Sequence, residues 1–245
     1  MTASDGRSDP PAAAGRLGPS ALRGLSFFAG LDEAAVAEAA RTGRVRRLRK
    51  GETLFYQGAE ANSFYLLLQG RLKAAQTGSD GQRTVVRFLG RGEPAGVLAL
   101  LGPGQRYPAN AVAVVDSVVL SWEGAALRRL VQCHPGIALN AMRAMGERVH
   151  DAAARLGEMA AERVERRLAH TLLRLVRQAG HRDPDGAVRI DFPISRQDIA
   201  EMTGTTLHTA SRVLSGWEHA GILEEGGRQR IVVRSPRALM RIVEN

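Results

Sequence analysis

Cysteine is almost absent from this sequence of 245 residues, and Cys133 is the only one. A single thiol cannot form a disulfide within the chain. It also cannot supply the several thiolates that four-thiolate zinc sites and iron–sulfur clusters take from one chain. We therefore expect neither a disulfide framework nor an iron–sulfur cluster.

Long apolar runs are also missing. Apolar runs such as VAVV and VVLSW fall far short of the roughly 18 residues that a membrane helix needs. The N-terminal stretch MTASDGRSDPPAAAGRLGPS has no apolar signal core. These absences predict a cytoplasmic protein that has no membrane partner.

Lysine is scarce, although the chain is basic. Only Lys50 and Lys73 are lysines among 34 basic residues, and the net charge is +9. A positive charge favours a polyanionic partner, but an arginine bias can also reflect genome composition, so charge alone does not decide for nucleic acid. Paired carboxylates, a nucleophile elbow, metal-ligand spacing and a phosphate loop are all missing, and we therefore expect no enzyme activity.

Composition and residue spacing divide the chain into four parts. Residues 1–20, rich in Ala, Pro, Gly and Ser, predict a disordered tail. Residues 21–134 contain short runs of Val, Leu, Phe and Tyr between glycines at about ten-residue spacing, after a short helix that Asp32 caps. This pattern predicts an antiparallel, jelly-roll-like β-roll that serves as an effector or sensor domain, with a hairpin at GSDGQRTVVRFL.

The third part, residues 135–163, predicts one long helix. Apolar residues recur there at alternating steps of three and four, as in a coiled coil. Its flanks carry Arg143, Glu147, Arg148, Asp151, Arg155 and Glu158. The pattern favours pairing with a second copy of the chain, and the alternative is packing against the roll. The residues of this dimer stripe are Met142, Met145, Val149, Ala152, Leu156 and Met159.

The fourth part, residues 164–245, predicts a winged helix-turn-helix. Ser195 and Asp198 form a capping-box pattern before a first helix, Gly204 supplies the turn, and Thr205 caps a second helix. The buried face of that second helix is predicted to hold Ala210, Val213, Leu214 and Trp217. The opposite face, His208, Ser211, Arg212 and Ser215, is small and polar, as entry into the major groove requires.

A strand, a Gly-Gly turn and a strand follow in GILEEGGRQRIVV and predict the wing. Arg228 and Arg230 could contact a phosphate backbone from it, or the segment could be an ordinary solvated turn. For the whole segment, the alternative to DNA binding is a helical hairpin that docks on a protein partner.

The two segments SRQDIAEMTGTTLHTASRVLSGWEHAGIL and GETLFYQGAEANSFYLLLQGRLK give the chain, over residues 21–245, a close resemblance to the Crp/Fnr family of transcription regulators. The resemblance implies an α+β fold and a homodimer that binds a palindromic DNA operator. It also implies contact with RNA polymerase if the protein is an activator. The implied phosphate contacts are Arg196, Gln197, Thr205 and Thr206, the implied base contacts are His208, Ser211 and Arg212, and Ser195 and Thr209 complete the DNA-binding set.

The effector region departs from the family members that bind cyclic nucleotides. They carry a GELGLF segment and an RSA segment, whose Glu and Arg bind the ribose and the cyclic phosphate. This chain has GVLALL and YPA instead, so Val97 replaces the carboxylate and Tyr107 the guanidinium. A buried phosphate without its arginine is poorly paired, and we expect that cyclic AMP is not the effector. Arg106 should point away, because neighbouring residues of a strand face opposite sides.

An apolar effector pocket remains as the prediction. Its expected lining is Gly96, Val97, Leu98, Leu100, Tyr107, Pro108 and Ala109. The run YPANAVAV resembles the nitric-oxide-responsive, haem-linked branch of the family, and haem would need an axial ligand. Candidates are His134, Cys133 and His150. Another apolar ligand, or no ligand, stays an alternative.

Overall fold

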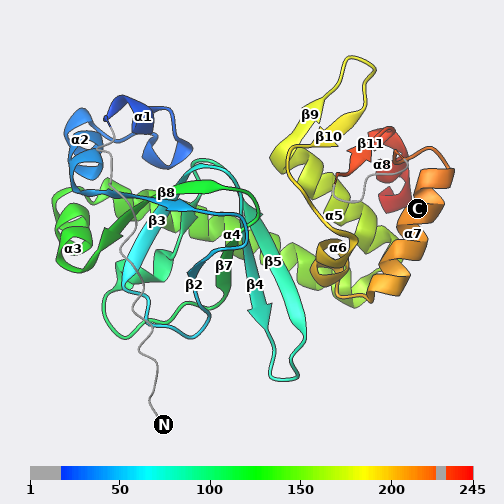
Figure 1. The fold of residues 1–245 in the computed structure, drawn as a ribbon, viewed down its shortest axis with the longest axis horizontal. Coiled ribbons are helices and arrows are strands. Elements are labelled where there is room, and N and C mark those ends of the chain that lie inside the picture. Colours follow the sequence, from blue (N-terminus) through cyan, green and yellow to red (C-terminus); the bar gives the residue numbers. More distant parts are fainter. Residues whose placement is uncertain (1–17, 225–229, 245) are drawn as a thin grey trace, which may run out of the picture.

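The computed structural model describes residues 18–224 and 230–244, and these form two domains joined by one long helix. Figure 1 shows the N-terminal strands and the C-terminal helices at opposite ends of the molecule, with α4 (Gly136–Ala161) running between them. Within the described ranges, no helix combines the length and the apolar character that crossing a membrane requires. The predicted fold class, an antiparallel roll followed by a long helix and a helix-turn-helix, is confirmed.

Two four-stranded antiparallel sheets build the roll. Spatial order in the first sheet is β1 (Arg44–Leu48), β8 (Ser117–Glu123), β3 (Ser63–Gln69) and β6 (Pro94–Ala95). Spatial order in the second is β2 (Thr53–Phe55), β7 (Asn110–Ala113), β4 (Leu72–Thr77) and β5 (Arg83–Leu89). Strands β4 and β5 form the hairpin predicted at GSDGQRTVVRFL, and Figure 1 shows that it projects from the body of the roll.

Short helices close one end of the roll. They are α1 (Ser20–Arg23), the 3-10 turn η1 (Ser26–Phe28), α2 (Glu33–Thr42) and α3 (Gly124–Cys133). Asp32 caps α2, as predicted, because its carboxylate accepts the backbone N–H of Ala35 at 2.7 Å. Residues 1–17 of the expected disordered tail lie outside the described part, and Ser20 already begins α1.

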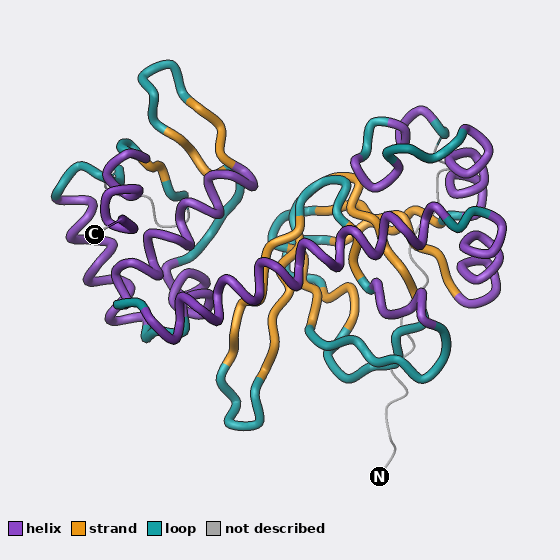
Figure 2. The backbone as a smooth tube through the Cα atoms, turned by 180° about the vertical axis from the view of Figure 1, so that it is seen from behind, coloured by secondary structure: helices purple, strands orange, loops and turns teal. Residues whose placement is uncertain are grey.

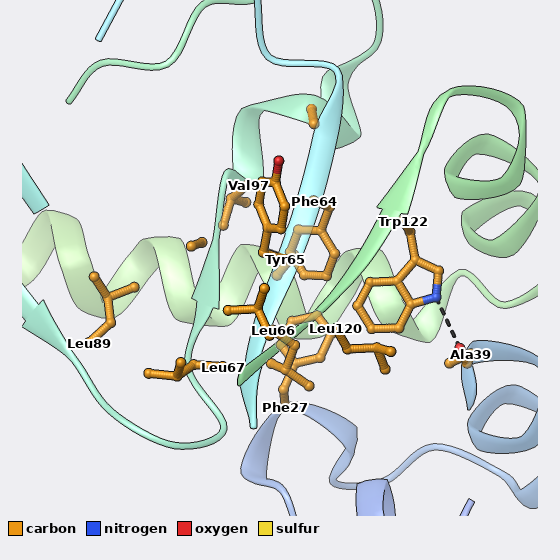
Figure 3. Close-up of a cluster of buried hydrophobic side chains, with 14 of the residues drawn as sticks. Phe27, Ala39, Phe64, Tyr65, Leu66, Leu67, Leu89, Val97, Leu120 and Trp122 are labelled. Atoms are coloured by element: carbon orange, nitrogen blue, oxygen red, sulfur yellow. Dashed lines mark hydrogen bonds between the residues drawn. The ribbon is translucent and has the colours of Figure 1, made fainter. Parts of the chain in front are cut away.

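The core of the roll is aliphatic and aromatic, as Figure 3 shows. Trp122 on β8 is buried beside Phe64 on β3, with ring centroids 5.7 Å apart. Its indole N–H donates to the backbone carbonyl of Ala39 at 3.0 Å, so that α2 is fixed to the sheet. Burial of a Trp normally requires such a partner for the N–H, and here the last turns of α2 supply it.

Helix α4 runs along the roll and continues to the C-terminal domain (Figure 2). Its inner face contributes Ile137 and Ala141 to the core of the roll, with Met145 packed against it. The outer face exposes a row of large apolar side chains, which are Met142, Val149, Leu156 and Met159, at exposed fractions of 54 to 68%. The alternative that the stripe packs against the roll is therefore wrong for these four and right for Met145.

The described residues of the C-terminal domain form four helices and a small sheet. The helices are α5 (Val164–Ala179), α6 (Arg196–Thr203), α7 (Leu207–His219) and α8 (Pro236–Glu244), and the strands are β9 (Gly180–Arg182), β10 (Val188–Ile190) and β11 (Val232–Val233). Strands β9 and β10 pair as a hairpin, in which the Asp183 N–H donates to the carbonyl of Ala187 across the turn, and β11 adds to the other edge of β10.

The two domains pack against each other through the β4–β5 hairpin. Val85 and Phe88 of β5 belong to the same apolar cluster as the helix-turn-helix, and the rings of Phe88 and Phe192 lie 4.8 Å apart. Beside them, the ammonium of Lys73 on β4 contacts the carboxylate of Asp198 on α6 at 2.5 Å. Helix α6 is thus held to the roll by apolar packing and by a half-buried ion pair.

The chain has only two lysines, which makes this domain contact measurable. Lys73 is 18% exposed at its side chain, whereas Lys50 is exposed. We expect an amine-reactive reagent at low dose to modify Lys50 well before Lys73, as measured by mass spectrometry of peptides. An Asp198→Asn variant should raise the rate at Lys73 and leave Lys50 unchanged. Equal rates at the two lysines in the unaltered protein would contradict the contact.

Candidate DNA-binding surface and effector cavity

Helix α6 begins with a complete capping box. The Ser195 hydroxyl accepts the backbone N–H of Asp198 at 3.0 Å, and the Asp198 carboxylate accepts the backbone N–H of Ser195 at 3.1 Å. Burial raises the pKa of Asp198, but hydrogen bonds from Lys73 and Ser195 outweigh that effect and hold it below its usual value. Asp198 therefore stays ionised and serves both the cap and the domain contact.

Helix α7 begins one residue later than predicted. Thr206, not Thr205, is the N-cap, because its hydroxyl accepts the backbone N–H of Thr209 at 3.2 Å. Both threonines are suitable capping residues, and the sequence could not fix which one has the extended backbone. Gly204 ends α6 in the left-handed conformation, at φ +61°, which other residues rarely adopt.

The two faces of α7 lie as their spacing predicts. Ala210, Leu214 and Trp217 are buried, and the Trp217 indole N–H donates to Glu165 of α5 at 3.3 Å. On the other side, His208 and Arg212 are exposed. Neither makes a hydrogen bond or an ion pair with the described residues, so their polar atoms are available to a partner.

Arg196, expected at a phosphate, is engaged inside the domain. Its guanidinium donates to both carboxylate oxygens of Glu218 at 2.7 Å and to the Ser215 hydroxyl at 2.9 Å. A bidentate pair of this kind fixes the angle between α6 and α7. In this structure, Arg196 therefore acts on the arrangement of the helices, and Ser215 is taken up by the same contact.

The remaining predicted residues line the same edge of the domain. Gln197 is exposed and donates to Glu201 at 3.0 Å, whereas Thr205, Thr209 and Ser211 are half-buried. Sequence reasoning missed Leu207, which begins α7 and is 46% exposed. Its position four residues before Ser211 places it on the polar face, and that helical spacing was visible in the sequence.

The predicted wing is described only at its two ends. Leu223 pairs with Val233 in an antiparallel bridge, and Arg230 is exposed. Arg228 and the turn of the wing lie outside the described residues.

A cavity of about 240 Å³ lies between the roll and α4. Of the predicted pocket residues, Gly96, Val97, Leu98, Tyr107, Pro108 and Ala109 line it, but Leu100 does not and packs against the core of the roll. Residues 97–101 form the short helix η2, of which Val97 and Leu98 line the cavity. Arg106 is exposed and donates to the carbonyl of Gly58, outside the cavity, as alternation along a strand predicts.

Tyr107 is a buried residue of the cavity wall. Its hydroxyl donates to the backbone carbonyl of Ser63 at 2.8 Å and accepts the N–H of the same residue at 3.1 Å, and its ring stacks on Phe55 at 3.9 Å. Burial raises the pKa of Tyr107, so the phenol is neutral. Gly96 is needed beside it, because a Cβ there would lie 2.6 Å from the Ser63 carbonyl oxygen.

The cavity is not wholly apolar, contrary to the prediction. Arg148, Asp151 and Arg155 of α4 line it together with Arg87 of β5. The sequence places these charges in the flanks of the dimer stripe and does not predict that they reach the cavity. Arg148 donates to the carbonyl of Pro94 and Arg155 to that of Val86, both on the roll. Burial, with the nearby charge of Arg87, lowers the pKa of Arg148 to about 10, so that the group stays cationic near neutral pH.

The three haem-ligand candidates do not meet at this cavity. Cys133 ends α3, His134 follows it, and His150 lies exposed on α4; none lines the cavity wall. Nor do three or more His, Cys, Asp or Glu side chains cluster as metal ligands within the described ranges. The cavity thus offers no imidazole or thiolate to a haem iron, and its residues do not fit that group.

A two-domain protein with this roll, this long helix and this helix-turn-helix has the architecture of a DNA-binding regulator of transcription. Residues 45–134 match the family described as cyclic nucleotide-binding domain, and residues 166–242 match the Crp-like helix-turn-helix domain. The cyclic AMP receptor protein of Thermus thermophilus is 30% identical over 205 residues, which cover 84% of this chain and 91% of that protein. The chain belongs to the Crp/Fnr family of transcription regulators.

Solved structures agree on the fold. FixK2 from Bradyrhizobium japonicum superposes with a TM-score of 0.70 at 24% identity, over 82% of this chain and 96% of that one. CLP of Xanthomonas campestris, described as a c-di-GMP responsive global regulator, gives a TM-score of 0.72 at 21% identity, over 83% of this chain and all of that one.

Replacement of Arg212 tests the exposed face of α7. We expect Arg212→Ala to weaken binding to a specific DNA site by about 1–3 kcal/mol and to relax the preference at one base pair, because a guanidinium pairs with guanine O6 and N7. Selection from a randomised DNA library, followed by titration, measures both effects. Arg237→Ala, at the start of α8, is the matched control and should leave the base preference unchanged. An unaltered preference in Arg212→Ala would remove this residue from base recognition.

Proposed function

We propose that this regulator acts as a homodimer that binds a palindromic operator, and that a ligand in the cavity of the roll controls this binding. The observation that carries the proposal is that His208 and Arg212 lie exposed on α7 and make no hydrogen bond or ion pair with the described residues, on a helix-turn-helix that packs against the roll. The exposed apolar row of α4 supports the dimer, and the cavity beside the domain contact supports the control.

The outer row of α4 suits pairing with a second copy. Met142, Val149 and Leu156 follow one another at heptad spacing, and large apolar residues in such a row are normally covered. A twofold axis along α4 would place two copies of α7 on the same side of the dimer. Half-sites one helical turn apart, at roughly 34 Å, follow from that symmetry.

Base recognition falls to the residues at the exposed N-terminal part of α7. Arg212 can donate to guanine, Leu207 can contact a thymine methyl group, and His208 offers a ring nitrogen to a base edge. Thr205, Thr206, Thr209, Ser211 and Gln197 lie around them and can bind phosphate or bases through hydroxyl and amide groups. Ser195 and Arg196 support this surface through the cap and the bridge to Glu218.

Strand β5 connects the cavity to the DNA-binding domain. Val86, Arg87 and Leu89 line the cavity, whereas Val85 and Phe88 pack against the helix-turn-helix. A ligand that shifts β5 must therefore change the packing of Phe88 on Phe192, and with it the position of α6. The second path is α4, which lines the cavity and leads directly to α5.

The effector we propose is not cyclic AMP, although a 30% identical relative carries the name cyclic AMP receptor protein. Val97 and the neutral Tyr107 stand where the family's cyclic-nucleotide contacts would be, and the Tyr107 hydroxyl is already bonded to Ser63. The competing functions are a cyclic-nucleotide-dependent regulator and a module that docks on a protein partner. If the protein activates transcription, RNA polymerase is a further partner.

Two measurements separate these possibilities. Selection of bound DNA from random sequence should return a palindrome, and calorimetry with cyclic AMP should show no saturable heat. Recovery of no motif, with binding that depends on salt but not on sequence, would favour the protein-docking alternative. Saturable binding of cyclic AMP would overturn our interpretation of Val97 and Tyr107.

The dimer surface can be tested by a single substitution. We expect Leu156→Glu to shift the protein from dimer to monomer, because it places a charge in each helix at the apolar contact. Sedimentation velocity measures the change. Met240→Glu is the control, because it changes another exposed apolar side chain, on α8, and the protein should stay dimeric. A Leu156→Glu protein that remains a dimer would exclude the outer row of α4 as the interface.

A further inference from the structure

We propose that the cavity binds a small monocarboxylate with an apolar, preferably aromatic, body, and that Arg148 and Arg155 hold its carboxylate. This inference rests on the proposed function, since it names the chemical class of the ligand for the same cavity. It is carried by three arginines that converge on a largely apolar wall.

The arginines come from both sides of the cavity. Arg148 and Arg155 lie two turns apart on α4, and Arg87 faces them from β5. Arg87 is paired with Glu93. Arg148 and Arg155 have no carboxylate within 4.0 Å in the part of the chain that the structure describes, and their bonds go to backbone carbonyls and to the sulfur of Met145.

Positive charge outweighs negative charge on the wall of the cavity. Arg87, Arg148 and Arg155 line the wall, and Asp151 is the one carboxylate among the described lining residues. Glu93, which pairs with Arg87, and Glu147 and Glu158, whose charges act on Arg148 and Arg155, lie outside the wall. A bound anion would add a negative charge at the wall, where an uncompensated charge is costly.

The guanidinium groups also have N–H donors that make no hydrogen bond with the described residues. The Nε–H groups of Arg87, Arg148 and Arg155 are buried and have no hydrogen-bond partner among the described residues. Buried polar atoms are nearly always bonded, so unpartnered donors around a cavity call for an explanation. A carboxylate is the natural acceptor, because its two oxygens match the edge of a guanidinium.

Mutual repulsion of the arginines agrees with this assignment. Burial is the main cause that lowers the pKa of Arg148 and of Arg155. The charge of Arg87 lowers both further, and the charge of Arg174 has a larger effect on Arg155. A bound anion would offset the repulsion among these cations.

The other wall residues and the volume of the cavity indicate the character and size of the ligand's apolar part. The stacked rings of Phe55 and Tyr107 face the cavity, and Tyr107 has its hydroxyl turned away to Ser63. The volume is about 240 Å³, and since benzene occupies a cavity of 150 Å³, a ligand of about ten non-hydrogen atoms fits. Aryl-alkanoic acids and medium-chain fatty acids are of this size, and a nucleotide is about twice as large.

Calorimetry on the full-length dimer tests the class with matched probes. The probes are 3-phenylpropionate and octanoate, each beside its neutral primary amide. We expect each acid to bind saturably and at least about ten-fold more tightly than its amide, because only the acid accepts the charge-assisted bonds. We also expect 3-phenylpropionate to bind more tightly than octanoate. No saturable binding of either acid at millimolar concentration, or equal affinity of acid and amide, would overturn the proposal.

Variants then locate the carboxylate. Arg148→Gln and Arg155→Gln should each lose about ten-fold or more of the affinity for 3-phenylpropionate and little of that for its amide. Arg143→Gln, on the same helix but outside the cavity, is the matched control and should bind both like the unaltered protein. Unchanged binding of the acid in both cavity variants would contradict the assignment. The comparison of acid and amide uses the unaltered protein, so it does not depend on whether the variants fold.

A gel shift with the selected palindrome, with and without 3-phenylpropionate, keeps this inference separate from the proposed function. An acid that binds but leaves the affinity for DNA unchanged supports the carboxylate site and contradicts the control of DNA binding by the cavity. An acid that binds to a protein with no specific DNA site supports the carboxylate site and refutes the operator-binding function.

Discussion

Strand β5 packs against two different partners at once, and much of the structure depends on this constraint. In a regular strand, side chains alternate between the faces, so Val86 and Phe88 would point the same way. Here Ala74 pairs with Arg87 and Ala75 with Val85, which leaves Val86 as the extra residue of a β-bulge. The bulge turns Val86 and Arg87 together toward the cavity, and it leaves Val85 and Phe88 together on the face of the DNA-binding domain.

This arrangement places residues of the cavity wall and residues of the domain contact next to each other on one strand. Phe88 packs on Phe192, Arg71 lies over the same ring at 4.4 Å, and Lys73 pairs with Asp198. Asp198 also caps α6, so the first turn of the helix-turn-helix is tied to the roll through the carboxylate that shapes it. A change at β5 cannot stay local, because packed side chains move between discrete arrangements and do not deform freely.

Helix α4 likewise has two faces with different surroundings. Its inner face closes the cavity with Met145, Arg148 and Arg155, and its outer face exposes an apolar row. The long arginine side chains reach the roll and bond to carbonyls there, while their aliphatic stems cover apolar surface. The same helix that we propose to form the dimer interface therefore also carries the charged groups that face a ligand.

Helical periodicity allowed the sequence by itself to determine much of this protein. The buried and exposed faces of α7, the cap at Asp32, the capping box at Ser195 and the class of the fold depend on residues a few positions apart, and local spacing is enough for these. The family likeness came from the same local motifs. Even there, one residue separated the predicted cap, Thr205, from the observed one, Thr206.

Contacts between distant segments could be decided only by the tertiary structure. Lys73 and Asp198 are 125 residues apart, and no local pattern joins them. Arg148 and Arg155 lie in the charged flanks of the predicted dimer stripe, and only the approach of the roll buries them. Leu100 lies in an apolar run like Val97 and Leu98, but of these three only Val97 and Leu98 line the cavity. Burial depends on what packs against a residue, and the sequence near that residue does not contain this information.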